Sequence, residues 1–397
     1  MLNPSYMYNI EIQKPKAKVV AQDPRFRSIG SLIVKVTNRC NLDCAYCYEK
    51  VSKTGQDMDI EVFKKLISTT LFSTRKRSVL VIFHGGEPSL INYEWYKDAT
   101  SYAKMLAHQN GKKIAFGLQS NLLALNNSKF IELRKLGINF SVSLDGPPEI
   151  LGGTLRGQDD RTIRKFQDVQ KIDRRVGVLF TINKINYDKF PAILKWLDEE
   201  TETSQFKANV VYSVGAGKRL TPMKAEEIFM AQKTIVDYMI ENPQSKLVEN
   251  NLSADIIRFF ESQNSSQTNT LCDEKICGAG KSVFGVNQKG ELFPCGRFEH
   301  DEYEYRLGDI ERNEFDAKEL KIFKQEISQF HERNPENWYN CLKCEARFMC
   351  NFSCQAFIDR SINKANIECE PTKLRYAYFK SRRNALLPLY HKFKNTK

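Results

Sequence analysis

The sequence predicts an α/β fold: a parallel sheet followed by a small cysteine-rich region. From residue 31 to about 213, short apolar runs alternate with helical patterns. The runs are continuously apolar, as expected for strands that are covered on both faces. Eight of the 11 cysteines lie between residues 271 and 370. About six βα units predict a partial (β/α)6, TIM-like barrel, and an open doubly wound sheet is the alternative, because periodicity does not show closure.

The strands are predicted from apolar and β-branched runs, at residues 31–36, 78–83, 113–120, 139–144, 176–182 and 207–214. The helices between them follow a helical apolar spacing, at 62–72, 93–108, 128–137, 159–172 and 187–199. Gly137 is expected to end the third of these helices. The fifth is predicted in spite of Pro191, and residues 222–262 are also predicted to be helical.

Changes in composition divide the chain into four segments. We expect a basic N-terminal extension at 1–30, the barrel at 31–262, a cysteine-rich domain at 271–370 and a basic tail at 371–397. The polar stretch at 261–270 is predicted to be a linker. The net charge is +12, which indicates either solubilising termini or a surface for an acidic partner. No nucleic-acid-binding motif points to DNA or RNA as that partner.

The cysteine content is informative because of the expected compartment. The sequence contains no run of 18 or more apolar residues, so no membrane span is expected. The N-terminus has no apolar segment typical of a secretory signal, so a cytoplasmic location is expected. In that reducing compartment, 11 cysteines indicate metal ligation and not a disulfide framework.

The stretch CNLDCAYC places Cys40, Cys44 and Cys47 on one loop directly after the first predicted strand. Thiolates suit both iron–sulfur clusters and zinc. A structural zinc site takes four ligands, whereas a four-iron cluster held by three cysteines leaves one iron open to an outside ligand. The alternatives are zinc with a distant fourth ligand such as His84, and three unrelated core thiols.

This loop and three later motifs resemble the radical S-adenosylmethionine (SAM) superfamily. HGGEP (84–88) fits its GGEP motif, and LQSN (118–121) and SLDGP (143–147) fit its polar segments after the third and fourth strands. The resemblance implies that the loop cysteines hold a [4Fe-4S] cluster whose open iron binds SAM. The residues it implies as SAM contacts are Tyr46, Gly85, Gly86, Glu87, Ser120, Asn121, Ser143, Asp145 and Arg156. GPPEILGGTL, before Arg156, departs from the usual pattern.

Residues 271–370 resemble the SPASM extension of radical SAM maturases, which carries a seven-cysteine signature. Cys272 adds an eighth thiol here. The resemblance implies a nearer auxiliary cluster held by Cys272, Cys277, Cys295 and Cys354. It implies a farther one held by Cys341, Cys344, Cys350 and Cys369, and thus three [4Fe-4S] clusters in all. Two structural zinc sites are the alternative.

The resemblance also implies the chemistry: SAM is cleaved reductively to a 5′-deoxyadenosyl radical, which abstracts a hydrogen atom. Auxiliary clusters that accept the remaining electron fit a net two-electron oxidation. The first hypothesis is therefore a maturase that cross-links a ribosomally made precursor peptide. The alternatives are a peptide epimerase or sulfatase-type dehydrogenase of the same superfamily, and a zinc-bound nucleic-acid-binding module.

The catalytic base is not assigned by the sequence. In sulfatase maturases an aspartate follows the cysteine that matches Cys295, but Gly296 stands here, which counts against sulfatase maturation. Arg297, Glu299 and His300 are candidates to face the substrate, and a solvated turn is the alternative. The expected partners are a precursor peptide with an acidic leader and a reducing donor such as flavodoxin or ferredoxin.

Overall fold

The computed structural model describes most of the barrel and part of the cysteine-rich region. The described residues are 22–157, 159–211, 213–261, 277–298, 305–311, 321, 323–328, 341, 343–350, 354, 356 and 367–395. Cys272, Glu299 and His300 lie outside them, as do residues 1–21 and nearly all of the predicted linker.

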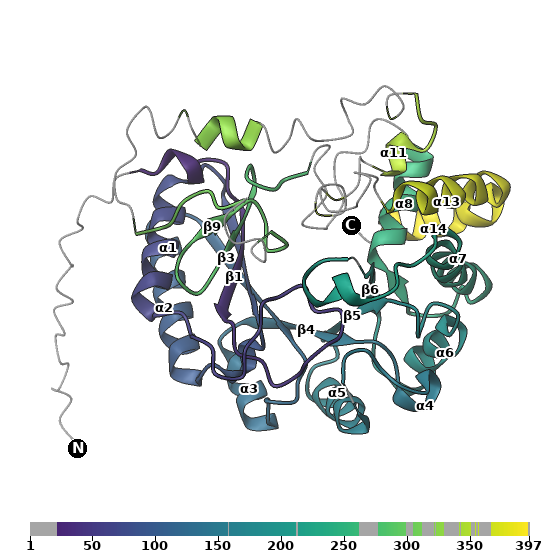
Figure 1. Ribbon diagram of the computed structural model, residues 1–397, viewed down its shortest axis with the longest axis horizontal. Helices are drawn as coiled ribbons and strands as arrows, with labels where there is room; N and C mark the ends of the chain where they lie inside the picture. The colour runs from purple at the N-terminus through teal and green to yellow at the C-terminus, as the bar shows by residue number, and fades with distance from the viewer. Residues whose placement is uncertain are drawn as a thin grey trace, which may run out of the picture.

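Six parallel strands form the centre of the fold: β1 (Ser31–Thr37), β2 (Ser78–Gly85), β3 (Lys113–Ser120), β4 (Ile138–Leu144), β5 (Gly177–Ile182) and β6 (Gln205–Val210). The full sheet has nine strands in the order β7-β6-β5-β4-β3-β2-β1-β8-β9. Strands that follow each other in sequence are neighbours, and right-handed crossovers then place every connecting helix on one face. Figure 1 shows these helices outside a curved sheet. This confirms the partial barrel over the doubly wound alternative.

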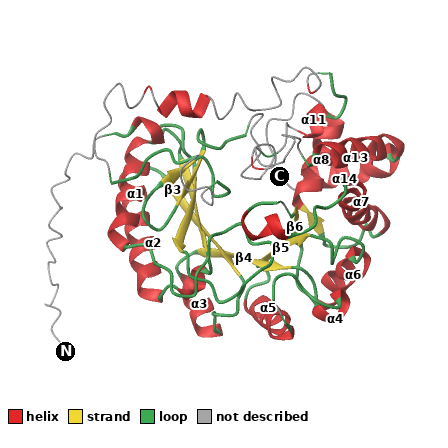
Figure 2. Cartoon of the chain, in the orientation of Figure 1, coloured by secondary structure: helices red, strands yellow, loops and turns green. Residues whose placement is uncertain are grey.

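The outer helices follow the predicted order: α1 (Ile60–Ser73), α2 (Tyr93–Gln109), α3 (Asn127–Lys135), α4 (Pro148–Leu151), α5 (Asp160–Ile172), α6 (Phe190–Glu200), α7 (Ala225–Glu241) and α8 (Asn250–Glu261) (Figure 2). Three details differ from the prediction, and the first is the short helix α4, which was not expected. The α6 helix starts at Phe190, which puts Pro191 in the first turn, where its missing N–H is not needed. The short strand β7 (Val248–Glu249) separates α7 from α8.

The two faces of the sheet carry different side chains. Leu32, Val34 and Val36 of β1 are fully buried towards the helices. Because strand side chains alternate between faces, the intervening positions point into the barrel. Near the carboxyl ends of the strands these positions are polar, namely Lys35, His84, Gln119, Ser143, Thr181 and Asn209. The barrel therefore has an apolar shell and a polar interior at the end where its loops gather.

The cysteine-rich region is joined to the barrel through the sheet itself. Its strand β8 (Val283–Val286) pairs in parallel with β1, and β9 (Leu292–Phe293) pairs antiparallel with β8. It also includes the short helix α11 (Arg347–Cys350). The predicted basic tail begins within α13 (Cys369–Ser381) and continues as α14 (Arg383–Asn395), and these helices pack on α7 and α8 (Figure 1). None of the described helices has the length and apolarity that crossing a membrane requires.

Candidate active site

The loop after β1 brings the first three thiols together. Its backbone is fixed by hydrogen bonds from Cys40 N to Ser52 O (3.0 Å) and from Cys47 N to Cys44 O (3.0 Å). The Sγ of Cys40 also accepts from the N–H of Leu42 at 3.4 Å. All three cysteines are partly buried, and none forms a disulfide. The loop therefore presents three reduced thiols at the carboxyl end of the barrel.

These thiols are in surroundings that oppose a bare thiolate. Burial raises the pKa of Cys44 to about 11 and that of Cys47 to about 12. The charges of Cys44 and Cys40 contribute to the shift at Cys47, so the three thiols lie within electrostatic reach of one another. Such a set becomes stable as thiolates when a bound metal group supplies positive charge. Three thiols are the donor type that an iron–sulfur cluster takes, and the cluster at this loop stays a prediction.

The glycine pair after β2 lets the strand end approach the cysteine loop closely. Gly85 has a φ of 122°, and a Cβ there would lie 2.2 Å from Thr37 O. A Cβ on Gly86 would lie 2.0 Å from Arg39 O. The N–H of Gly86 donates to Thr37 O at 2.8 Å, and that of Glu87 donates to Arg39 O at 2.7 Å. Any side chain at either glycine would force the two segments apart.

Three of the predicted SAM contacts are bonded to each other and to the loop. The buried carboxylate of Glu87 accepts from Ser120 Oγ at 2.8 Å and from Asn121 N at 2.7 Å. Asn121 Nδ2 donates to Asn41 Oδ1, within the cysteine loop, at 2.8 Å. Ser143, further along, accepts from Gln119 Nε2 at 2.7 Å. Glu87, Ser120 and Asn121 therefore tie the ends of β2 and β3 to the loop that bears the thiols.

A second network joins the remaining predicted residues. Tyr46 donates its hydroxyl to Asp145 Oδ1 at 2.6 Å, and Arg156 Nε lies 3.4 Å from the same oxygen. The guanidinium of Arg156 stacks 5.2 Å from the centre of the Tyr46 ring. Its backbone oxygen accepts from Cys44 Sγ at 3.5 Å. Burial raises the pKa of Asp145, with Arg156 acting in the opposite direction. The Asp145–Arg156 ion pair is therefore almost completely buried and lies beside Cys44.

The sequence interpretation missed two asparagines in this network. Asn183 Nδ2 donates to Asp145 Oδ2 at 3.5 Å, and Asn186 Nδ2 donates to Asp145 O at 3.2 Å. Both side chains are fully buried. They follow β5 as Asn-x-x-Asn in TINKIN, so the polar pair directly after an apolar strand was the signal that could have found them.

A buried charged cluster lies beside the loop on the barrel's inner face. Lys35 Nζ is 2.7 Å from Glu49 Oε2, and His84 Nδ1 is 3.5 Å from Glu49 Oε1. The hydroxyl of Tyr48 lies 3.3 Å from His84 Nε2. Burial disfavours the Glu49 carboxylate, but Lys35 and His84 together lower its pKa. The contacts of His84 are thus with Tyr48 and Glu49, whereas the zinc alternative required it as a metal ligand.

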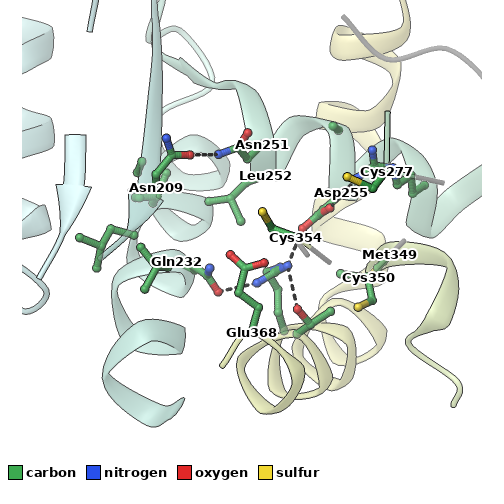
Figure 3. A pocket seen from close by; sticks show the side chains of 18 of the residues that line it. Asn209, Gln232, Asn251, Leu252, Asp255, Cys277, Met349, Cys350, Cys354 and Glu368 are labelled. Carbon is green, nitrogen blue, oxygen red and sulfur yellow. Dashed lines mark hydrogen bonds and ion pairs between the residues drawn. The ribbon is translucent and has the colours of Figure 1, made fainter. Parts of the chain in front are cut away.

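The second set of thiols borders a cavity of about 210 Å³ between the barrel and the cysteine-rich region. Figure 3 shows Asn209 and Asn251 on the barrel side, with Cys277, Cys350 and Cys354 on the other. Cys277, Cys295 and Cys354 also pack against one small core, formed by Ala279, Phe293, Phe298, Tyr305 and Ala356. The structure therefore brings together three of the four cysteines expected at the nearer auxiliary cluster, and Cys272 lies outside the described residues.

The other four cysteines form a separate neighbourhood. Burial raises the pKa of Cys341, and the charges of Cys369 and Cys344 act in the same direction. Burial also raises the pKa of Cys350 to about 12, with further contributions from Glu368 and Cys369. In the part of the chain that the structure describes, no three His, Cys, Asp or Glu side chains form a group able to hold one metal ion. The division of these thiols between two auxiliary clusters therefore stays a prediction, and Cys350 also lines the cavity that Cys277 and Cys354 border.

The segment after Cys295 lies between β1 and the cavity. A Cβ on Gly296 would lie 2.6 Å from Cγ2 of Ile33 on β1, so the position has no room for a side chain without movement. Arg297 Nη1 donates to Cys354 Sγ at 3.7 Å, and both residues line that cavity. The expectation that Arg297 faces the substrate stays a prediction.

Comparison with known proteins finds a family that matches part of this chain. Residues 34–197 match the family described as the radical SAM superfamily. A cysteine-type anaerobic sulfatase-maturating enzyme from Clostridium novyi is 19% identical over 87% of this chain and 94% of its own. A PqqA peptide cyclase from Bradyrhizobium diazoefficiens is 24% identical over 67% of this chain and 66% of its own. An Fe-coproporphyrin III synthase from Methanosarcina barkeri is 28% identical over 57% of this chain, which spans about half (54%) of that protein.

Solved structures share the fold. Native anSMEcpe with bound AdoMet and Cp18Cys peptide superimposes with a TM-score of 0.75 at 20% identity, covering 92% of this chain and 99% of that one. SuiB from Streptococcus suis, bound to the precursor peptide SuiA, has a TM-score of 0.60 at 15% identity over 84% of this chain and 73% of that one. Residues 34–197 of this chain are thus a radical SAM domain, a match that implies SAM and a [4Fe-4S] cluster and favours an enzyme over the zinc-module alternative.

Proposed function

We propose that this enzyme oxidises a ribosomally made precursor peptide and joins two of its residues by a cross-link. The relatives named for sulfatase maturation and PqqA cyclisation, and the two solved structures with bound peptides, support a peptide substrate. The Fe-coproporphyrin III synthase is matched over only about half of its own length, so it gives weaker support for a porphyrin substrate than these proteins give for a peptide.

The chain's own residues would divide the work as follows. Cys40, Cys44 and Cys47 would hold the cluster, and the turn at 85–87 would receive SAM where it meets the loop. The cluster and SAM, when bound, supply a radical that removes a hydrogen atom from the substrate. Asp145 and Arg156, enclosed beside Tyr46, would orient the charged groups of SAM.

The observation that carries oxidation is the thiol-lined cavity beside the barrel. Removal of one hydrogen atom leaves an unpaired electron on the peptide. A closed-shell, cross-linked product forms only when a second electron and a proton also leave. Cys277, Cys350 and Cys354 border a cavity that Asn209 of β6 reaches from the barrel. The nearer auxiliary cluster, with Cys277, Cys295 and Cys354 among its expected ligands, would accept that electron. We therefore propose two auxiliary clusters, with 31–262 as the barrel and 271–370 as the auxiliary domain.

Gly296 argues against a sulfatase-type reaction. The aspartate that follows the matching cysteine in sulfatase maturases has no equivalent here, and the 2.6 Å approach to Ile33 leaves no space for one. The net charge of +12 supports a precursor with an acidic leader, recognised by charge complementarity. An acidic flavodoxin or ferredoxin would suit the same positive surface as electron donor.

The test is the intact mass of a candidate precursor peptide after co-expression with the enzyme. The candidate is a short reading frame next to this one. We expect a loss of two hydrogens that depends on the loop cysteines, with the Cys40→Ala/Cys44→Ala/Cys47→Ala triple variant as the matched control. Fragmentation would then locate the bond. If the mass is unchanged in ordinary water, and the peptide gains deuterium at an α-carbon when the reaction is run in heavy water, the enzyme is an epimerase. That result would overturn the proposal.

A further inference from the structure

Six cationic side chains gather at the amino ends of three strands, at the opposite end of the barrel from the cysteine loop. Because β1, β2 and β3 are parallel neighbours, the segments that precede them meet at one end of the sheet. The N–H of Arg75 donates to Arg27 O at 2.9 Å, and that of Lys113 donates to Arg77 O at 2.9 Å. We call this surface the amino-end patch, and it consists of Arg27, Arg75, Lys76, Arg77, Lys112 and Lys113.

No carboxylate of the preceding segments offsets the charge of the amino-end patch. Residues 24–30, 74–77 and 110–113 contain neither Asp nor Glu. Asp23, which borders them, is engaged by Arg25, whose Nη2 lies 2.7 Å from Asp23 Oδ2. In the part of the chain that the structure describes, none of the six side chains forms an ion pair, and all but the partly buried Lys112 are exposed. Like charges repel one another, so a cluster of this kind becomes favourable when an anion binds to it.

The same end of the barrel shows the ordinary arrangement one strand further on. Before β5, Arg134 and Arg175 both form ion pairs with the carboxylate of Asp173. Their charge is thus offset within the protein, whereas the charge of the amino-end patch stays available to a partner.

The surroundings of the amino-end patch favour an anionic peptide over nucleic acid. Single-stranded nucleic acid is bound by bases that stack on exposed aromatic rings, in addition to basic residues. The rings of Phe26 and Phe116, beside the patch, are buried. The exposed neighbours are small, namely Ser28, Ser78 and Gly111. The surface therefore offers positive charge without rings on which bases could stack.

The position of the patch also favours a peptide over an electron donor. The strand β1 has seven residues, so it separates the patch from the cysteine loop by about 23 Å at ~3.3 Å per residue. A donor must approach the cluster that it reduces, and the predicted SAM-binding cluster lies at the other end of β1. A peptide covers the distance with about ten extended residues between the part that binds and the part that reacts.

We propose that the amino-end patch is the docking surface for the acidic leader of the precursor peptide. The inference rests on the proposed function, which supplies a substrate of that charge. Contacts between exposed charges are individually weak, so several cations act together and the affinity falls as salt is added. A leader held here raises the effective concentration of the reacting segment at the barrel.

The experiment measures peptide binding to the full chain by fluorescence anisotropy. The probe is a fluorescein-labelled peptide with the acidic N-terminal half of the candidate precursor. A matched probe carries Asn and Gln in place of its Asp and Glu. The variant Arg75→Gln/Lys76→Gln/Arg77→Gln removes three charges from the patch.

The control variant is Arg164→Gln/Lys171→Gln/Lys195→Gln, which removes the same number of charges from exposed positions on α5 and α6. Modification of the whole precursor by each enzyme is followed by mass spectrometry. Dithionite is the reductant in these assays, so the docking of a protein donor does not affect the result.

We expect the patch variant to bind the acidic probe about 10-fold more weakly than the wild type. Its KM for the precursor should rise while kcat stays the same, because the lost contacts are made equally in the ground state and the transition state. The control variant should bind the acidic probe as the wild type does, and the matched probe should bind weakly to all three enzymes.

Four results would overturn the inference: equal binding by the patch variant and the wild type, an equal loss in the control variant, equal binding of the two probes, or tighter binding of a labelled RNA of the same length. If instead the wild type binds the acidic probe through the patch but leaves the mass of the precursor unchanged, the proposed function fails and the docking surface stands.

Discussion

The two thiol regions of this enzyme are built in opposite ways. The first is local: Cys40, Cys44 and Cys47 share one loop, which glycines and backbone hydrogen bonds hold against the next strand end. The second is assembled from segments far apart in the sequence, with Cys277 and Cys295 flanking β8 and β9, and Cys369 opening α13. Their charged neighbours differ as well. Arg156, whose backbone oxygen accepts from Cys44, is paired with the buried Asp145, and Arg297 donates to Cys354.

This difference in construction suits two different tasks, binding an outside ligand in the first region and accepting electrons in the second. A local loop with a paired arginine suits a cluster that must leave room for an outside ligand. A region assembled from several segments would hold the proposed auxiliary clusters between the barrel and the C-terminal helices. If this is correct, the two regions should fail in different ways when they are altered.

The largest expected effect comes from removing one thiol in each region. Cys47→Ala should abolish 5′-deoxyadenosine formation, because the SAM-binding cluster loses one of its three protein ligands. Cys354→Ala should keep that activity and lose only the modified peptide. Both products can be quantified from one anaerobic assay by chromatography and mass spectrometry. If Cys354→Ala also stopped SAM cleavage, the two regions would not be functionally separate.

The second effect is on stability at the first region. Arg156→Met leaves the Asp145 carboxylate buried without its cation, which should cost about 3–5 kcal/mol in the free energy of unfolding. The matched control is Arg161→Met, because the Arg161–Asp159 pair is exposed and such pairs contribute ~0–1 kcal/mol. Denaturant unfolding of the two variants in parallel measures the difference. Similar small losses in both would mean that the enclosed pair adds nothing to the loop's support.

The smallest effect is on the pH dependence of stability, through the buried Glu249. Burial raises the pKa of Glu249 to about 7, although its carboxylate accepts from the N–H groups of Ala208 and Leu252. An unfolded glutamate titrates near ~4.3. Between pH ~4.3 and 7, Glu249 therefore keeps its proton in the folded state and has lost it in the unfolded state. The stability that this proton contributes is complete below pH ~4.3 and is lost as the pH rises towards 7. The total, at ~1.36 kcal/mol per pKa unit, is about 4 kcal/mol.

Glu249→Gln removes this titration. The difference in thermal midpoint between the wild type and the variant should change across pH 5–8 in favour of the variant, and stay constant above that range. A difference that is independent of pH would show that Glu249 is charged throughout.

The sequence predicted the repeating part of the fold well, because alternating strands and helices leave a periodic signal. It missed β8, whose four residues hold a glycine and follow a stretch rich in cysteine and glycine. It also placed the start of the helix at residues 190–200 three residues early, because apolar spacing does not show that Pro191 belongs in the first turn.

At the site, short motifs located the cysteine loop, the glycine pair and the Asp145–Arg156 segment. Contacts between distant segments were beyond the sequence. Glu87 stays a predicted SAM contact, and the sequence did not show that its carboxylate oxygens accept from Ser89, Ser120 and Asn121. The direction of Arg297 depends on where Cys354 folds, and 56 residues separate them in the chain, too many for a local pattern to report.

The pairing of β8 with β1 has a consequence for anyone who divides this protein. Ser31 to Val34 are in register with Val283 to Val286. A shortened chain that ends after α8 would leave the hydrogen-bonding edge of β1, the strand that leads into the cysteine loop, open to solvent. Unprotected edges of this kind recruit other chains. The barrel expressed alone should therefore self-associate. Adding the C-terminal segment as a separate chain should cover this edge again and reduce the self-association.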